Sequence, residues 1–425
     1  MKEREAMEYI ESISGRGVVP GLDSIRELCR RLGDPQDALR FVHIAGTNGK
    51  GSVSAYIAEV LKCGGYRVGR YISPVIFDYR ERIQVNGRSI TREALGRLME
   101  QVKQACEEMR AEGKAQPTAF EVETALGFLY WKEKACDIVV LECGMGGLLD
   151  ATNVIETTVL AVITSVSVDH MRFLGNTPEE IAAQKAGILK PGVPAVSAKQ
   201  QETAEKVIAD RAAELNCPLT VMEHARITAV KYGLEKQRFS YGGFSGLEIL
   251  LAGKYQVENA ALAVEALRLL SGKGFPVREE KLRQGLRQTA WPGRFTIVGK
   301  KPWFVVDGAH NEDGAKRLAE SVEFYFTNKR IIYIMGVLKD KEYEKMVGLT
   351  HRLADQIITV TPPDDSRALP AYELAQEIAK VHPGVTAVDS LEEAVEMARL
   401  LAGKEDVIVA FGTLSFAGRL IKITE

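Results

Sequence analysis

The sequence lacks the features that mark secreted, membrane-spanning and zinc-stabilised proteins. Its 425 residues include 6 cysteines, which are scattered without a Cys-x-x-Cys pair. This argues against a disulfide framework and against a structural zinc site. No stretch approaches the roughly 18 consecutive apolar residues that a membrane span requires. The first residues, MKEREAMEYIESI, are charged and lack the apolar centre of a signal peptide. We therefore expect a soluble, cytoplasmic protein.

An excess of charge of either sign is also missing. The chain carries 55 lysines and arginines against 57 aspartates and glutamates, a formal net charge of −2. No overall field therefore favours nucleic acid or an anionic membrane as a partner, and we expect neither. We expect a monomer.

What the sequence does contain is alternation between short apolar runs and helical patterns, which indicates α/β domains. The first such region, at about residues 40–200, predicts a mostly parallel sheet covered by helices. Residues 218–252 hold closely spaced strand-like segments, which predict an antiparallel addition at one edge. After TAWPGRF (289–295) the alternation restarts with five further candidate strands. We predict one domain at residues 1–295 and a smaller α/β domain at residues 296–425.

The segment FVHIAGTNGKGSVSAYIAEVL (41–61) reads as a strand, a glycine-rich loop and a helix. Glycines let backbone N–H groups approach phosphate oxygens, and the helix N-terminus adds positive potential. Lys50 would meet the outer phosphates, and the Ser52 hydroxyl would lie near magnesium or a phosphate. The alternative is an ordinary glycine-rich turn, which the combination of these features disfavours. The predicted nucleotide-binding residues are Gly46, Thr47, Asn48, Gly49, Lys50, Gly51 and Ser52.

The loop AGTNGKGS (45–52) is similar to the nucleotide loop of the Mur-type ATP-dependent amide ligases, which is shorter than the common P-loop. Its Gly-Ser ending most resembles the branch that comprises folylpolyglutamate synthase and dihydrofolate synthase. The resemblance extends over nearly the whole chain. It implies a Mur-ligase-like fold, with a P-loop-containing, mostly parallel sheet domain and a Rossmann-like C-terminal domain. It also implies ATP as a co-substrate that is split to activate a carboxylate.

Three strand-like segments end in side chains that could bind a metal ion, namely Ser73, Glu142 and His170. In open parallel sheets, ligands collect beyond the carboxyl ends of the strands, and hard oxygen donors suit Mg²⁺. Alone, each would more often be a solvated or structural residue. The family uses the serine of Ser-Pro-His-Leu, the glutamate of Glu-x-Gly-x-Gly-Gly and the histidine of Asp-His as metal ligands. The resemblance thus implies the same role here, in a site with two Mg²⁺ ions.

Lys185 lies on a predicted helix that begins with Thr177 and Glu180 in capping-box spacing. It shares a face with Ile181 and Ile188, so its side chain either reaches outward to solvent or points at an anion. QKAGI resembles the family's EKAGI segment, with glutamine in place of glutamate. The family lysine is carbamylated and helps to hold a second magnesium ion. The resemblance implies a carbamate on Lys185, and it makes Lys50, Lys185 and His170 the candidate catalytic residues.

The substrate side is predicted from two segments, PTAFEVETALGFLYW (117–131) and GGLLDATN (146–153). The first begins with capping-box spacing, so its threonine and glutamate have a purely structural alternative. In the folate ligases the matching Thr-x-Phe-Glu and Gly-Gly-Arg-Leu-Asp-Ala-Thr-Asn segments lie on the pterin side, and a phenylalanine could stack on a flat heterocycle. The implied folate-binding residues are Thr118, Phe120, Glu121, Leu149, Asp150 and Ala151. Val75 and Leu148 replace a family histidine and arginine, which leaves the choice between pteroate and polyglutamylated folate open.

Further ATP contacts are implied by YQVENAALA (255–263), WPGR and VVDGAHN. The first resembles the family's His-Gln-x-x-Asn-Ala segment, with Tyr255 in place of histidine. These contacts are Asn259, Arg294 and Asp307, each of which would be unremarkable by itself. His310 and Ser415 are assigned to the incoming glutamate, although Glu312 stands where the family commonly has proline.

Together these features predict an ATP-dependent amide ligase that adds L-glutamate to dihydropteroate, to tetrahydrofolate (poly)glutamates or to both. The acid would react through an acyl phosphate. One alternative keeps the chemistry but uses a cell-wall nucleotide-peptide precursor, which is disfavoured because the phosphate loop already begins near residue 46. Another alternative is a nucleotide-gated interaction protein without a ligase step.

Overall fold

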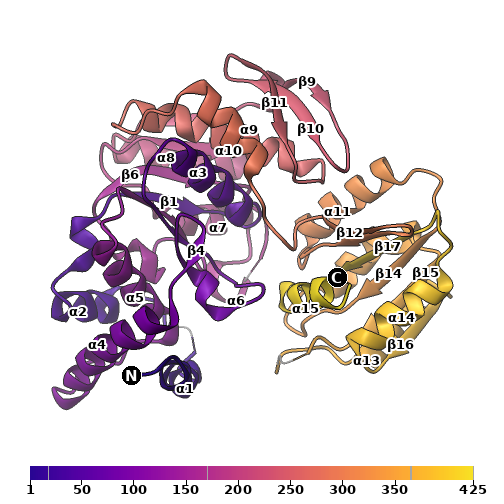
Figure 1. Ribbon diagram of the computed structural model, residues 1–425, viewed down its shortest axis with the longest axis horizontal. Helices are drawn as coiled ribbons and strands as arrows, with labels where there is room; N and C mark the ends of the chain where they lie inside the picture. Colours follow the sequence, from indigo (N-terminus) through magenta and orange to yellow (C-terminus); the bar gives the residue numbers. More distant parts are fainter. Residues whose placement is uncertain (18, 170, 364–365, 425) are drawn as a thin grey trace. The chain divides into compact units, whose positions relative to one another are not determined.

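The computed structural model describes residues 1–17, 19–169, 171–363 and 366–424. They form two compact units (Figure 1). The first unit contains Met1–Ile227, Tyr241–Gly243 and Asn259–Gln288, and the second contains Thr228–Ser240, Phe244–Glu258 and Thr289–Glu425. The predicted boundary at residues 295 and 296 lies close to Thr289. Most of residues 228–258, however, group with the C-terminal residues, so the units do not follow chain order.

The first unit is built on an eight-stranded sheet with the order β4-β3-β2-β5-β1-β6-β7-β8. Six strands, β2, β5, β1, β6, β7 and β8, run parallel, whereas β3 and β4 pair antiparallel at one edge. Every residue of β1 and β5 is buried, as expected for central strands that are covered on both faces. The strands are β1 (Phe41–Ala45), β2 (Val68–Tyr71), β3 (Ile83–Val85), β4 (Arg88–Ser89), β5 (Ile138–Glu142), β6 (Thr158–Ile163), β7 (Ala195–Ala198) and β8 (Leu219–Met222).

The helices of this unit begin where the sequence supplies caps. The Thr118 hydroxyl accepts a hydrogen bond from the Glu121 N–H at 3.3 Å and Glu121 bonds back to the Thr118 N–H, so the predicted capping box is present. Thr177 and Glu180 form a second one. The helices are α1 (Glu3–Ser14), α2 (Asp23–Arg31), α3 (Lys50–Cys63), α4 (Arg92–Ala111), α5 (Ala119–Glu133), α6 (Met171–Leu174), α7 (Pro178–Ala186), α8 (Glu202–Glu214), α9 (Tyr255–Ser271), which continues from the second unit, and α10 (Glu279–Gln288).

The prediction for residues 218–252 was wrong in one part. The first segment, β8, pairs parallel with β7 and extends the main sheet. The remaining three strands form a sheet of their own with the order β11-β10-β9, in which β9 and β10 are antiparallel. Turn glycines and strand spacing predicted the strands but not their partners, because pairing depends on tertiary packing. These strands are β9 (Thr228–Lys231), β10 (Gln237–Tyr241) and β11 (Phe244–Ile249).

The second unit contains a six-stranded sheet with the order β12-β13-β17-β14-β15-β16. All five predicted strands are present and parallel, and an additional strand, β12, pairs antiparallel with β13 at the edge. The strands are β12 (Thr296–Lys300), β13 (Trp303–Val306), β14 (Ile331–Met335), β15 (Gln356–Val360), β16 (Val385–Val388) and β17 (Val407–Phe411). The helices are α11 (Glu312–Tyr325), α12 (Tyr343–Thr350), α13 (Ala371–Ala379), α14 (Leu391–Leu401) and α15 (Leu414–Thr424).

Each unit has its own hydrophobic core. In the first, Phe41, Phe128 and Trp131 are fully buried, and their rings meet edge to face between β1 and α5. In the second, Tyr333 and Phe411 pack edge to face between β14 and β17. Across the described ranges, the structure contains no helix long and apolar enough to cross a membrane.

Candidate active site

The predicted phosphate loop connects β1 to α3 in a conformation that depends on its glycines. Gly49, the residue before α3, has φ +87°, and a Cβ atom there would lie 2.7 Å from Oδ1 of Asn259. At Gly46 a Cβ atom would overlap the hydroxyl of Thr164. The loop is tied to the end of β6, since the Thr47 N–H donates to the Ser165 carbonyl at 2.7 Å. The structure therefore brings Asn259 beside the phosphate loop, as the sequence implied.

Lys50 lies at the first position of α3, where its ammonium group is held over the loop. Its Nζ donates to the carbonyls of Gly46 at 3.0 Å and Thr47 at 3.1 Å. These neutral acceptors are weaker partners than phosphate oxygens, so the ammonium could transfer to an incoming phosphate. Ser52 is buried in the first turn of the same helix.

Arg70 on β2 is hydrogen-bonded to the first turns of α3, next to this loop. Its Nη2 donates to the Gly51 carbonyl and its Nε to the Ser54 hydroxyl, both at 2.9 Å. Burial lowers the pKa of Arg70 to about 10, against the opposing charges of Glu142 and Glu59. A fixed cation thus lies close to a proposed metal ligand. The sequence pattern gave no sign of this residue, because an arginine in an apolar strand carries no motif.

Of the three metal ligands predicted at strand ends, two lie within the described residues. Glu142 ends β5 and is 3% exposed, and β5 pairs parallel with β1 so that Glu142 lies opposite Ile44, just before the phosphate loop. Ser73 follows β2 by two residues and lines a cavity of this unit. His170 lies outside the described residues. Within the parts of the chain that are described, no group of three or more His, Cys, Asp or Glu side chains could hold a metal. The oxygen donors of Glu142 and Ser73 are of the type that suits Mg²⁺.

Lys185, near the end of α7, is 3% exposed and points inward. Burial, together with the charge of Lys50, lowers its pKa to about 7, while Cys143, Asp169 and Asp150 act in the opposite direction. The two lysines therefore lie close enough to repel one another. Of the two alternatives for this lysine, an outward-reaching side chain is excluded.

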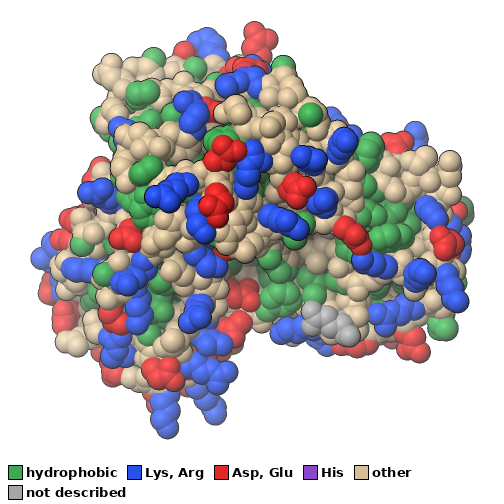
Figure 2. Space-filling model, turned by 45° about the horizontal axis from the view of Figure 1, so that its top comes forward, with side chains coloured by type: hydrophobic (Ala, Val, Ile, Leu, Met, Phe, Trp, Pro, Cys, Tyr) green, Lys and Arg blue, Asp and Glu red, His purple; other side chains and the backbone are tan. Residues whose placement is uncertain are grey.

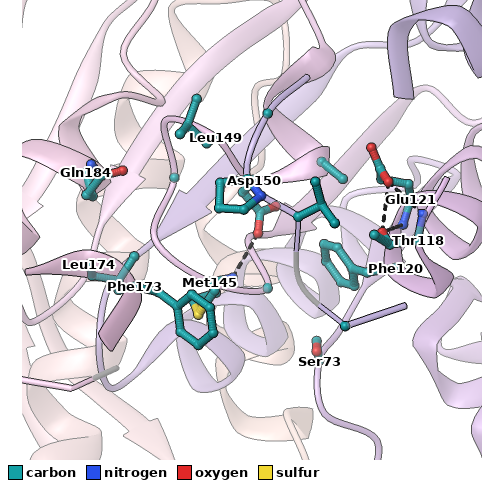
Figure 3. Close-up of a pocket in the computed structure, with 17 residues that line it drawn as sticks. Ser73, Thr118, Phe120, Glu121, Met145, Leu149, Asp150, Phe173, Leu174 and Gln184 are labelled. Carbon is teal, nitrogen blue, oxygen red and sulfur yellow. Dashed lines mark hydrogen bonds between the residues drawn. The ribbon is translucent and has the colours of Figure 1, made fainter. Parts of the chain in front are cut away.

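A cavity of about 280 Å³ opens beside these residues in the first unit (Figure 3). All six residues implied for folate binding line it, together with Ser73. Glu121 and Asp150 are the acidic side chains among the described lining residues, which include no lysine or arginine. Burial raises the pKa of Asp150, and hydrogen bonds from Thr152 and from backbone N–H groups oppose the shift. Burial likewise raises the pKa of Glu121.

The residues predicted on the second unit gather around the end of β13. Asp307 is buried, and its Oδ2 accepts hydrogen bonds from the Tyr255 hydroxyl and the Phe295 N–H, both at 2.7 Å. Arg294 donates to the Gly293 carbonyl at 3.2 Å. His310 is half-buried, with its Nδ1 2.8 Å from the Gly308 carbonyl oxygen. Ser415 lies in α15.

Comparison with known proteins decides the family. Residues 44–267 match the model of the Mur ligase middle domain, and residues 293–414 match the Mur ligase, glutamate ligase domain. The dihydrofolate synthase/folylpolyglutamate synthase of Bacillus subtilis is 36% identical over 428 residues, covering 99% of this chain and 98% of that protein. The chain belongs to the folylpolyglutamate synthase/dihydrofolate synthase family of Mur ligases.

Solved structures of the family have the same fold. The folylpolyglutamate synthase of Thermotoga maritima is 33% identical, with a TM-score of 0.85 over 99% of this chain and 96% of that chain. The Escherichia coli protein FolC, solved in complex with DHPP and ADP, is 28% identical, with a TM-score of 0.87 over 100% of this chain and 97% of that chain. The predicted Mur-ligase-like architecture is thereby confirmed.

Some of the residues that line the cavity were not predicted from the sequence. A loop between α1 and α2 contributes Gly17, Val19, Pro20 and Gly21, and the segment around α6 contributes Phe173 and Leu174. Little in the sequence indicated them, because a Gly- and Pro-rich stretch such as residues 17–21 predicts only a loop between two elements. Exposure marks them in the structure, since Val19 is 62% and Phe173 45% exposed.

Two of the departures from the family pattern, Leu148 and Val75, lie within two residues of cavity-lining residues in the sequence. Leu148 follows the cavity-lining Gly147, is 40% exposed, and donates its N–H to the Gln184 carbonyl at 2.7 Å. Val75 is half-exposed and lies two residues after Ser73. Apolar side chains thus replace two cationic or ionisable groups of the family pattern.

Proposed function

We propose that the chain is an ATP-dependent ligase that joins L-glutamate to the carboxylate of a folate-type substrate. One observation carries this proposal: the glycine-rich phosphate loop, the inward-pointing Lys185 and the cavity lined by all six implied folate residues belong to the same unit. The related B. subtilis protein bears the name of both reactions of the family, and the E. coli relative was solved with DHPP and ADP. Both support the assignment.

The charges of the described cavity lining indicate which end of the substrate it holds. On the face of the molecule shown in Figure 2, by contrast, lysines and arginines are interspersed with aspartates and glutamates. The described lining of the cavity offers the carboxyl groups of Glu121 and Asp150 and no cation. Such a wall repels carboxylates and phosphates but accepts hydrogen bonds from the N–H groups of a neutral heterocycle. Phe120 and Leu149 supply apolar surface for a flat ring. We infer that the pterin enters the cavity, so that the reacting carboxylate stays outside, on the side of the phosphate loop.

The nucleotide would be held by the loop between β1 and α3. Backbone N–H groups at the start of α3 favour a bound anion, and Lys50 would exchange its carbonyl partners for phosphate oxygens. Asn259, which lies beside Gly49, would also contact the bound nucleotide, and its nearness to the loop supports this role. Arg294 and Asp307 on the second unit are the further nucleotide contacts of this proposal, and His310 and Ser415 its glutamate contacts.

Mg²⁺ would be held by Ser73, Glu142 and His170, with a carbamate on Lys185 holding a second ion. Bound magnesium neutralises the negative charge that develops on the transferred phosphoryl group. The burial of Lys185 supports the carbamate, because it favours the neutral amine that reacts with CO₂.

In the proposed reaction a substrate carboxylate oxygen attacks the γ-phosphorus of ATP, and the bond to the β–γ bridging oxygen breaks to release ADP. The amine of glutamate then attacks the acyl carbon of the mixed anhydride. The tetrahedral intermediate loses inorganic phosphate and a proton, and an amide remains. Lys50 stabilises the phosphoryl transfer by its charge. Because water would hydrolyse the acyl phosphate, the site must exclude it.

The decisive test is substrate-dependent release of ADP. Dihydropteroate and tetrahydrofolate monoglutamate are each supplied with ATP and glutamate, and ADP, phosphate and ligated product are measured. We expect equal amounts of all three with at least one of the two acids, and loss of turnover in Lys50→Met. A cell-wall nucleotide-peptide serves as the comparison acid. Turnover with that acid alone would overturn the folate assignment. We further propose a cytoplasmic monomer; the six free cysteines fit a reducing compartment.

A further inference from the structure

A buried chain of side-chain hydrogen bonds connects the strand before the phosphate loop to the wall of the substrate cavity. His43, in the middle of β1, has its Nε2 2.9 Å from Oγ1 of Thr152. The same Oγ1 lies 2.5 Å from Oδ1 of Asp150, which lines the cavity. His43 and Thr152 are both fully buried. Neither residue is among the described residues that line the cavity, and neither was among the predicted site residues, although Thr152 lies in the GGLLDATN segment.

The other hydrogen bonds of Asp150 fix its orientation. Its Oδ1 also accepts the Thr152 N–H at 3.0 Å, and its Oδ2 accepts the Met145 N–H at 2.8 Å (Figure 3). Three donors from the protein therefore converge on this carboxylate, which stabilises its ionised form against the penalty of burial. One of the three, the Thr152 hydroxyl, depends on a partner of its own to keep its proton directed at Asp150.

The positions of the protons follow from this arrangement. The hydroxyl proton of Thr152 goes to Asp150, because this contact is shorter than its 3.4 Å contact with Sγ of Cys143 and ends on a carboxylate. The hydroxyl oxygen can then only accept from Nε2 of His43, 2.9 Å away, so Nε2 carries a proton. Sγ of Cys143 lies 3.1 Å from the same Nε2 and can accept the same N–H. Within the described part of the chain, Nδ1 of His43 has no hydrogen-bond partner. A protonated Nδ1 would leave a buried N–H unpaired, which disfavours the other tautomer.

We propose that His43 and Thr152 are positioning residues of the ligase: their directional hydrogen-bond chain holds Asp150 as an ionised acceptor facing the substrate cavity. An acceptor at this place binds N–H groups of the heterocycle, whereas a rotated or protonated carboxyl group would present a competing O–H. The inference rests on the proposed function for the identity of the ligand. The hydrogen-bond chain itself does not depend on that identity.

The first measurement uses the unmodified protein. With ¹⁵N-labelled histidine, long-range ¹H–¹⁵N NMR distinguishes the two neutral tautomers, and His43→Gln identifies the signal among the 6 histidines. We expect a neutral ring protonated at Nε2. A ring protonated at Nδ1 would overturn the proposal, whatever the protein catalyses.

The second measurement separates positioning from folding. In Thr152→Val, which keeps the shape and removes the hydroxyl, we expect the KM for the pterin acid to rise about tenfold. The Kd for ATP should remain close to that of the parent, whereas the thermal midpoint should fall, because Nε2–H of His43 and Oδ1 of Asp150 each lose a buried partner. Thr152→Ser retains a hydroxyl at this position, and His43→Gln retains an N–H donor. Both variants should therefore keep the parental KM for the pterin acid.

The matched control is Thr158→Val. Thr158 is also a buried threonine of this unit, but its hydroxyl has no hydrogen-bond partner among the described residues. Its KM should equal that of the parent. A folded Thr152→Val variant with parental KM, or an equal rise in Thr158→Val, would overturn the positioning role. If the parent turned over no pterin acid, the proposed function would fail. The NMR result would still show whether the hydrogen-bond chain runs in the proposed direction.

Discussion

Two buried cationic or ionisable side chains near the phosphate loop differ in how they compensate for burial. Arg70 keeps its charge through hydrogen bonds to Gly51 and Ser54 and the nearby charge of Glu142. Lys185 has burial and the charge of Lys50 acting against its ammonium form. A lysine in this situation is better suited to react as an amine than to pair as a cation.

Lys185 therefore gives the first residue-scale prediction. Lys185→Gln keeps a similar length but cannot carry a carbamate, so we expect turnover to fall about 100-fold through loss of a metal ligand. Native intact mass of the parent should show the addition of one CO₂, which the variant should lack. Lys190→Gln is the control, because Lys190 is also partly buried but pairs with Glu156 at 3.6 Å. Equal turnover in parent and Lys185→Gln would contradict the carbamate.

His43 gives a second prediction, on acid stability. Burial lowers its pKa to about 3 in the folded protein, whereas an unfolded histidine titrates near 6.5. Between these values the unfolded chain binds a proton that the folded chain refuses, so this residue makes stability fall as pH decreases, by up to about 1.4 kcal/mol per pH unit. From pH 7 to pH 5 the thermal midpoint of His43→Gln should fall less than that of the parent. His224→Gln, at an exposed position, should follow the parent. If all three lost stability equally, His43 would not be responsible.

Among the elements, the loop between β1 and α3 shows how much a short sequence can determine. Its strand, glycines and helix all follow from residues 41–61, because each local preference agrees with the others. Gly49 carries a positive φ and faces Asn259, so an added methyl group would act on both backbone and side chain.

We predict that Gly49→Ala destabilises the protein by about 1–2 kcal/mol and weakens ATP binding at least tenfold, since it combines backbone strain with a collision. Gly65, just beyond the end of the same helix, has φ +96°, and no described atom lies within 4 Å of the place that an added methyl group would take. Gly65→Ala should therefore lower the thermal midpoint less, through backbone strain alone, while leaving the Kd for ATP unchanged. Calorimetric titration with ATP measures the difference. Parallel loss of ATP affinity in both variants would show that strain alone is responsible.

The elements also show where sequence reasoning ended. Caps at Thr118 and Thr177 and the strand-end position of Glu142 depend on neighbours in sequence, and they were predictable. The pairing of β8 with β7, and the contribution of residues 17–21 to the cavity, depend on segments far apart in the chain. The His43–Thr152 contact joins residues that are 109 positions apart in the chain. Such contacts carry no local pattern.

At the scale of the whole molecule, the cavity and the phosphate loop belong to one unit, and the two units have separate cores. A ligand that binds one unit alone should therefore stabilise that unit selectively.

We predict that dihydropteroate alone slows amide hydrogen exchange in β5 and the Gly144–Ala151 segment and leaves β14 and β17 unchanged. At a concentration 100 times Kd the protection can reach about 2.7 kcal/mol. Exchange followed by mass spectrometry resolves these peptides. Protection confined to β14 and β17 would place the pterin in the other unit and contradict the cavity assignment.

The division of the chain also bears on how the protein is made. The first unit includes Asn259–Gln288, so a nascent chain on the ribosome cannot complete it until Gln288 has been synthesised. Residues 228–240 and 244–258 emerge earlier, yet their companions begin only at Thr289. Until those later residues have been made, these strands lack the rest of the unit to which they belong, and during this interval an incomplete chain is most open to chaperones and to aggregation.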